Sequence, residues 1–186
     1  TVIRGQSDAH LNGYSTGTFP FGYKTVELPG TEFGRLRKLR KEIMPYEDHA
    51  QWVQKVFDWF VKDKMPIQQI AKELTRLEAP KDHRSTVSHW NHQSVSHMLS
   101  NGYYIGICAY GKKTNVRNPL TGKVRQKLRP VDEASKWITV REDLRIIDQE
   151  TFDQAQEMLE ENRKRYAKKR GKAGRFKGAT NDIQNP

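Results

Sequence analysis

The sequence predicts an α+β fold that is mainly helical, with a helix-turn-helix-like core, small β-hairpins and a C-terminal helix. Three observations predict it. Apolar residues recur at spacings of three and four in two short runs between 66 and 106, joined by a polar connection. A longer run with the same spacing covers 46–62. Short stretches rich in β-forming residues, bounded by Gly, Pro and Asn, lie before and after these helices.

The chain is strongly basic, and this limits the kind of partner it can have. Its 186 residues allow one ordinary domain or two small ones, and 33 Lys and Arg against 22 Asp and Glu give a net charge of +11. An anionic partner follows, and nucleic acid is the usual one. The basic residues are not gathered on one long amphipathic helix, which argues against a membrane surface. A single cysteine, Cys108, excludes an internal disulfide and fits a reducing compartment.

The segment before the first helix reads as a linker followed by a basic hairpin. Residues 1–18 are polar and without periodicity, which is typical of a linker. An aromatic turn and a short strand at 25–28 follow, and Pro29-Gly30 gives a turn signal. The run 35–41 then carries five positive charges in seven residues. It is expected to form the second strand of a hairpin or an extended arm, either solvated or in contact with phosphates.

The run 46–62 is the clearest helix and the expected scaffold. Pro45 precedes it, and Glu47 and Asp48 suit the positive end of the helix dipole. The helical pattern that follows starts after Pro66 and stops before Pro80. Its apolar face consists of Ile67, Ile70, Ala71, Leu74 and Leu77.

The second short helix is predicted to begin at Asn91, a good N-cap, and to end near Asn101-Gly102. Trp90, just before the cap, is expected to pack on this helix. Its inward stripe is Val95, Met98 and Leu99, so its outward face carries the polar residues Gln93, Ser96, His97 and Ser100. A solvated surface and a base-reading surface are both compatible with that face.

In the rest of the chain, from residue 103 onward, predicted strands alternate with basic segments. A strand is predicted over 103–110 and a short one over 137–140, with a Lys/Arg-rich loop between them at 111–129 that could follow a nucleic-acid backbone or form a hairpin tip. A helix capped by Asp148 comes next, and the basic tail at its end is expected to be flexible. The histidines show no HxxxH spacing, so no metal site and no cofactor are predicted.

The order of these elements resembles the recombinase domain of large serine recombinases, the phage-integrase and transposon type. The resemblance spans about 20–161, and the ordered combination of motifs carries it. The matching residues are Pro20-Phe21-Gly22-Tyr23, Val56-Phe57, Ile70-Ala71-Lys72-Glu73-Leu74, Trp90, Ser94-Val95, Leu99, Asn101, Tyr104-Ile105-Gly106, Trp137, Ile146-Ile147-Asp148 and Phe152.

The resemblance implies a division of the chain and a function. Residues 1–18 would link to a catalytic domain that is absent here, 19–162 would be the recombinase DNA-binding domain, and 163–186 would be a basic flexible tail leading to a zinc-ribbon domain. Such a fragment would bind double-stranded DNA at an attachment half-site without catalysing integration or excision itself. Its expected partners are that DNA, the other domains of the same chain and further recombinase protomers. The expected location is the bacterial cytoplasm, at the nucleoid.

Two groups of residues are predicted to contact DNA. Base reading is assigned to the outward face of the second short helix, Gln93, Ser96, His97 and Ser100. Backbone contacts are assigned to basic residues near it or in dense basic runs: Lys81, Arg84, Lys112, Lys113, Arg37 and Lys38. A stand-alone helix-turn-helix transcription regulator and an RNA-binding protein remain as alternatives.

Overall fold

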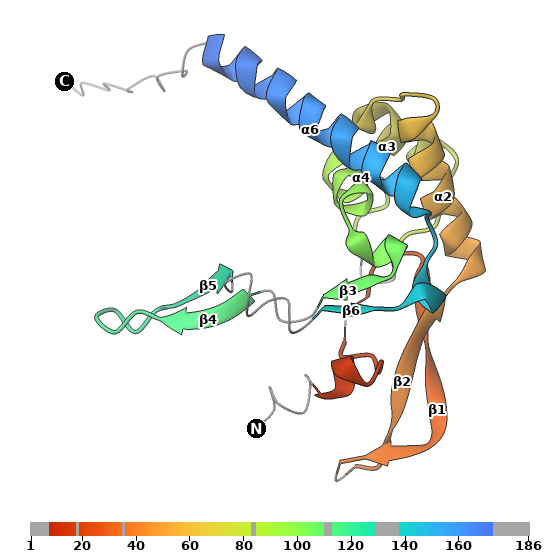
Figure 1. Cartoon of the computed structure of the whole chain (residues 1–186), viewed down its shortest axis with the longest axis vertical. Helices are drawn as coiled ribbons and strands as arrows, with labels where there is room; N and C mark the ends of the chain where they lie inside the picture. Colours follow the sequence, from red (N-terminus) through yellow and green to blue (C-terminus); the bar gives the residue numbers. More distant parts are fainter. Residues whose placement is uncertain are drawn as a thin grey trace, which may run out of the picture.

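A computed structural model describes residues 8–17, 19–34, 36–82, 85–109, 113–128 and 138–172. Helices α2, α3, α4 and the first part of α6 pack into a helical body. The β1–β2 hairpin projects from one end of this body, and the separate β4–β5 hairpin projects from its side (Figure 1). The predicted α+β, mainly helical fold is therefore confirmed.

Helix α2 (Glu47–Val61) is the scaffold, as its pattern predicts. Val53, Val56 and Phe57 are fully buried. Helix α6 (Gln149–Lys172) packs against α2, and the centroid of the Phe152 ring lies 6.2 Å from that of Phe57. Asp148 caps α6 through its carboxylate, which accepts the backbone N–H of Thr151 at 2.7 Å. Aromatic and branched apolar side chains at the contact between α2 and α6 thus form the centre of the hydrophobic core.

Helices α3 (Ile67–Arg76) and α4 (His92–Leu99) form the expected pair. Pro66 stands at the N-cap of α3, and Asn91 caps α4 by accepting the Ser94 N–H at 2.8 Å. The predicted inward residues of α4, Val95, Met98 and Leu99, are all buried. Spacing and cap chemistry together were sufficient to predict both helices.

The predicted strand over 103–110 is largely wrong. Residues Gly102–Ile105 form a short 3₁₀ helix, η1, and only Ile107–Ala109 form a strand, β3, which pairs antiparallel with β6 (Ile138–Val140). The Asn101 side chain accepts the N–H of Tyr103 at 3.1 Å and starts the turn. Gly106 ends it with φ +80°, a conformation that favours glycine. These local bonds override the β propensity of the two tyrosines.

Strands β1 (Tyr23–Phe33) and β2 (Lys38–Pro45) form the predicted hairpin. The turn, however, involves Gly34 and Arg37. Both have positive φ, and the Arg37 N–H donates to the Gly34 carbonyl at 3.2 Å. Pro29-Gly30 instead lies inside β1, where the register shifts between Glu27 and Glu32. The turn signal there marks an irregularity in the strand and not its end.

Part of the predicted linker is tied to this hairpin. Residues 8–11 form a helical turn, and Tyr14 bridges to Glu42 of β2. The guanidinium of Arg141 donates to the Gly13 carbonyl at 3.1 Å and to the Glu42 carboxylate at 2.9 Å. It also binds Asp143 of the 3₁₀ helix η2 (Glu142–Leu144), which lowers the pKa of that carboxyl group. The segment 8–17 therefore packs on the domain and does not behave as a free linker.

Two basic segments have more regular structure than expected. Strands β4 (Lys113–Arg117) and β5 (Val124–Leu128) form an antiparallel hairpin within the predicted loop 111–129. Helix α6 continues to Lys172, so 163–172 is helical and not a flexible tail. Glu160 lies 3.7 Å from Arg163 and 3.9 Å from Lys164, at helical spacings that support this extension.

Candidate nucleic-acid interface

Helix α4 is held in place from two sides. The indole N–H of Trp90 donates to the Ala79 carbonyl at the end of the α3 segment over 3.2 Å, and the Trp90 ring meets Phe21 edge-on. At the other end of α4, the side chain of Gln156 on α6 donates to the Leu99 carbonyl over 2.7 Å. An element fixed at both ends can present its outer side chains in a constant geometry.

The outer face of α4 is polar and open to solvent. Gln93, His97 and Ser100 are exposed, whereas Ser96 is half-buried at one edge. The Ser100 hydroxyl donates to the Ser96 carbonyl at 2.8 Å, so its hydrogen is used within the helix. Of these four residues, Gln93 and His97, one helical turn apart, are exposed and have no hydrogen bond within the described chain, so both can bond an external partner. An amide and an imidazole can both match the donors and acceptors of base edges.

One edge of this face borders a cavity of about 490 Å³ lined by Gln93, His97 and Lys81. The Lys81 ammonium donates to the carbonyls of Val87 and His89, both at 2.5 Å. It also lies 5.7 Å from the centroid of the Trp90 ring. Lys81, predicted as a backbone contact, therefore holds the α3–α4 connection in shape. Its charge contributes to the potential of the face, but two of its three N–H donors bond carbonyls within the chain.

The other edge borders a second cavity, of about 670 Å³, lined by His92 and Ser96. Gln68 from the start of α3 and Arg165 and Tyr166 from α6 are among the other residues that line it. Sequence reasoning did not assign Gln68 or Arg165 to the site. Gln68 lies in a predicted helix, whereas Arg165 lies in the predicted flexible tail. The packing of α3 and α6 around α4 brings both residues to the cavity that Ser96 also lines.

The remaining predicted cations are dispersed. Arg37 and Lys38 lie at the turn of the β1–β2 hairpin, which points away from α4 (Figure 1). Lys113 is exposed at the start of β4. Arg84 and Lys112 lie outside the described residues. The structure therefore gathers the α4 residues and Lys81 but does not bring Arg37 and Lys38 to the same place.

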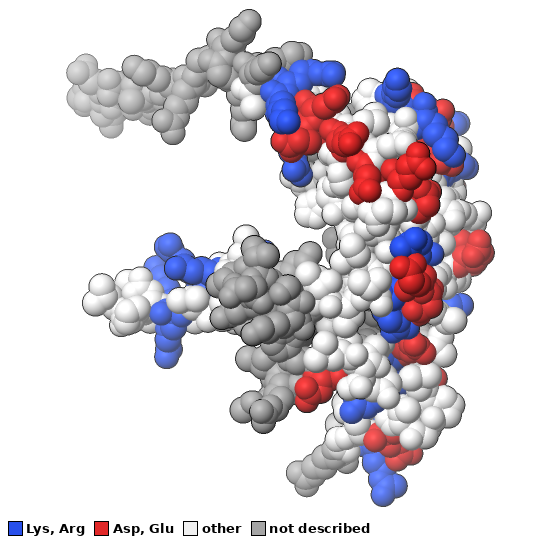
Figure 2. Space-filling model, in the orientation of Figure 1, with Lys and Arg blue, Asp and Glu red and all other residues white. Residues whose placement is uncertain are grey.

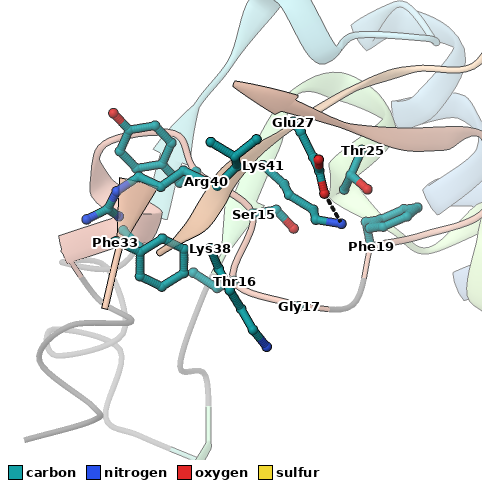
Figure 3. A pocket seen from close by; sticks show the side chains of 13 residues that line it. Ser15, Thr16, Gly17, Phe19, Thr25, Glu27, Phe33, Lys38, Arg40 and Lys41 are labelled. Atoms are coloured by element: carbon teal, nitrogen blue, oxygen red, sulfur yellow. Dashed lines mark ion pairs between the residues drawn. The ribbon is translucent and has the colours of Figure 1, made fainter. Parts of the chain in front are cut away.

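A third cavity, of about 990 Å³, lies between the β1–β2 hairpin and residues 14–17 with Phe19 (Figure 3). Arg40 is held between two rings, 4.6 Å from the centroid of Tyr14 and 5.1 Å from that of Phe33. Lys41 pairs with Glu27 at 3.1 Å. Among the described residues that line this cavity, Lys38 is the cation for which the structure shows neither an ion pair nor a ring contact. The Arg40–Tyr14 contact, with the Ser15 N–H that donates to the Lys41 carbonyl at 2.6 Å, fastens the hairpin to residues 14–17.

Surface charge differs between the two sides of the molecule. On the side opposite the β4–β5 hairpin, basic and acidic residues alternate (Figure 2). The described surface also holds ion pairs, including Lys62 with Asp58 at 2.8 Å and Arg76 with Glu73 at 2.5 Å. The β4–β5 hairpin carries Lys and Arg without acidic neighbours in the same view. Basic charge that is not neutralised therefore lies on the hairpin side.

Two kinds of site are absent from the described residues. They contain no group of three or more His, Cys, Asp or Glu side chains placed to hold a metal ion. No helix among them is long and apolar enough to cross a membrane.

A capped α3–α4 pair with a polar outer helix, mounted on an α+β scaffold, defines a helix-turn-helix-like module. The Recombinase family model matches residues 47–162, from α2 into α6. The chain therefore belongs to the Recombinase family, which confirms the resemblance read from the sequence. A comparison with curated proteins gives no match.

Two solved structures share the fold. One, described as the crystal structure of a complex between DNA and an LSR (large serine recombinase), aligns with a TM-score of 0.52 and 18% identity, over 86% of this chain and 38% of that one. The other comes from work on the sequence requirements of the Listeria innocua prophage attP site. It aligns with a TM-score of 0.52 and 17% identity, over 86% of this chain and 51% of that one. The chain thus spans about half or less of the length of these relatives.

Proposed function

We propose that this chain binds double-stranded DNA at a recombination attachment half-site and so positions a serine-recombinase catalytic domain for integration or excision. The observation that carries the proposal is the outer face of α4, which is polar, exposed and fixed at both ends within the segment that the family model matches. The likeness to a structure of an LSR–DNA complex supports the same partner.

Base reading would fall mainly to Gln93 and His97. An exposed Gln can bond the N6 and N7 positions of adenine with two hydrogen bonds, and His can bond a purine acceptor or donor according to its tautomer. Ser96 and Ser100 would contribute from the edges of the face, Ser96 from the cavity that Gln68 and Arg165 also line. Specificity would thus come from short polar side chains rather than from charge.

Backbone contacts would come from exposed cations. Lys113 is open to solvent, whereas Lys81 is engaged with two carbonyls and would act by holding the connection before α4. Arg37 and Lys38 would reach DNA only beyond the segment that α4 covers, because their hairpin points away from that helix. Lys and Arg contacts of this kind set affinity and its salt dependence without reading sequence.

The role proposed for the chain is binding, and the chemistry of strand exchange is assigned to the catalytic domain of the parent protein. Other recombinase protomers and a zinc-ribbon domain are the further partners proposed. A location in the bacterial cytoplasm at the nucleoid follows from that role. A stand-alone regulator would need its own dimer interface. An RNA-binding protein would prefer structured RNA, and competition between duplex DNA and RNA separates that case.

The test is competition binding by fluorescence anisotropy at near-physiological salt. A labelled duplex carrying an attachment half-site is displaced by unlabelled random duplex or by a structured RNA of equal length. The proposal expects the random duplex to compete much less well than the half-site, and the RNA less well still. Equal competition by RNA would overturn the assignment to DNA, and equal competition by random duplex would overturn the assignment to an attachment site.

A further inference from the structure

The β4–β5 hairpin, called the basic arm from here on (residues 113–128), stands apart from the core of the described fold. Its two strands pair only with each other, and every residue from 115 to 128 is exposed. An isolated two-stranded hairpin is marginally stable in water at best. A conformation of this kind is expected to be stabilised by a surface outside the domain.

The charge of the arm indicates the chemistry of that surface. Five of its sixteen residues are basic and none is acidic: Lys113, Arg117, Lys123, Arg125 and Lys127. Cross-strand pairing places Lys113 and Arg117 on one face, while Arg125 and Lys127 occupy the other. Like charges gathered on one short ribbon repel each other unless an anion lies between or beside them.

The tip of the arm is ordered by its own hydrogen bonds. The Asn118 side chain accepts the backbone N–H groups of Leu120 and Thr121 at 2.9 and 3.3 Å, and the Asn118 N–H donates to the Lys123 carbonyl at 2.8 Å. Gly122 has φ +65°, which suits the reversal of the chain. The cations are therefore carried on a defined ribbon and not on an unstructured loop.

The position of the arm relates it to α4. In Figure 1 the arm and the C-terminal half of α6 project to the same side of the helical body, with α4 between them, while α2 lies on the opposite side. A duplex that met the outer face of α4 would have the arm along one flank. A two-stranded ribbon is also narrow enough to enter the major groove or to follow its edge.

We propose that the basic arm is a second DNA contact, which lies along the sugar–phosphate backbone beside the base pairs met by α4. This inference rests on the proposed function, since it takes duplex DNA as the ligand. The arm extends the bound segment beyond the base pairs that α4 alone can cover. Its contacts add affinity and salt dependence without adding sequence preference, because Lys and Arg on phosphates do not distinguish bases.

A second copy of this chain is the other partner that could bind the basic arm. The arm exposes apolar side chains, and Leu120 at its tip is 94% exposed. The chain carries a net charge of +11, however, so a basic arm docked on a second copy would meet a surface of like charge. Charge complementarity therefore favours the phosphates of DNA.

The experiment compares two variants that each remove two positive charges. Arg125→Gln/Lys127→Gln removes charge from the arm. Lys55→Gln/Lys62→Gln removes the same charge from α2 and its C-cap. The strands of the arm pair only with each other, so the first pair of substitutions is expected to leave the far-ultraviolet circular dichroism spectrum unchanged. Affinity for a half-site duplex is measured across a series of salt concentrations, together with hydroxyl-radical footprints.

The arm variant is expected to lose affinity by roughly tenfold, and by the same factor for half-site and random duplexes. The slope of log K against log salt should become shallower by about 1.8, because Arg125 and Lys127 each no longer neutralise a phosphate and each phosphate contributes about 0.9. Its footprint should shorten at one end. The α2 variant should keep the wild-type slope and footprint. If the two variants show the same affinity, salt slope and footprint on a duplex that the wild type binds, the arm proposal is overturned while the proposed function stands. If the wild type binds no duplex, both are overturned.

Discussion

The hydroxyl oxygen of Thr75 on α3 accepts the backbone N–H of Trp90 over 2.9 Å. The same hydroxyl donates to the Ala71 carbonyl one turn earlier, also over 2.9 Å. Trp90 immediately precedes the Asn91 cap, so this bond fixes the point at which the chain enters α4. Together with the indole bond to Ala79, it sets the position of the proposed recognition helix relative to α3.

Thr75→Val tests this link because valine keeps the shape of threonine and removes the acceptor. The backbone amide of the buried Trp90 would have no partner, and the free energy of unfolding should fall by about 1–2 kcal/mol. Urea denaturation measures this. Thr86→Val, at an exposed position in the connection, is the matched control and should change stability little. Equal effects at the two positions would show that Thr75 does not anchor α4.

Gln93→Ala tests base reading. Removal of a two-bond contact to a base should reduce discrimination between cognate and random duplex by about 1–3 kcal/mol. Lys113→Ala, on the arm, should instead weaken both duplexes alike and lower the salt slope by about 1. Titrations of both variants on both duplexes give the comparison. Equal reductions in affinity on the two duplexes for Gln93→Ala would contradict its assignment as a reading residue.

Gly106→Ala tests the turn that joins η1 to β3. Gly106 has φ +80°, and an added Cβ would collide with the backbone carbonyl oxygen of Arg141. Gly30→Ala is the control, because Gly30 has φ +75° with open space around it. The control should cost about 1–2 kcal/mol for the backbone conformation alone. Gly106→Ala should cost clearly more, about 3 kcal/mol or above, and thermal unfolding of the two variants measures the difference.

Asp148 at the start of α6 predicts a pH dependence. The backbone N–H of Thr151 and then its hydroxyl bond the carboxylate, and they lower the pKa of Asp148 below its usual value. A carboxyl group with a lowered folded-state pKa stabilises the fold above its unfolded pKa, near 4, and this contribution disappears as pH falls through the folded pKa.

The measurement is the urea midpoint of wild type and Asp148→Asn between about pH 6 and pH 2.5, a range that spans the unfolded pKa of an aspartate. The variant should have a lower urea midpoint than the wild type near pH 6. The difference between the two midpoints should disappear toward pH 2.5, because the neutral Asn does not titrate. A gap that stays constant across this range would mean that the ionised form of Asp148 is not the one the fold favours.

The helices were predictable because each combines periodic apolar residues with a recognisable start. Asn91 and Asp148 accept the backbone N–H groups expected of N-caps. The errors arose where a local bond or a distant contact decides the conformation. The side chain of Asn101 and the positive φ of Gly106 turned a predicted strand into η1. Ion pairs around Glu160 belong to a helix that continues into the predicted tail.

The proposed site was predictable only in part. The inward stripe of α4 determines its outward face, so Gln93 and His97 could be found from spacing alone. Spacing could not show that Lys81 bonds two carbonyls of its own loop, or that α6 brings Arg165 to the cavity that Ser96 also lines. It also could not show that Arg37 and Lys38 lie at the tip of a hairpin directed away from α4. Such facts depend on tertiary packing, which no local pattern encodes.

The most direct test of sequence reading by α4 is selection from a pool of randomised duplex DNA at near-physiological salt, followed by sequencing of the bound fraction. We expect the wild-type chain to enrich one asymmetric motif. We also expect Gln93→Ala and His97→Ala variants to bind while showing no preference at particular positions of that motif. Tight binding without enrichment, or a motif that both variants leave intact, would contradict sequence reading by α4.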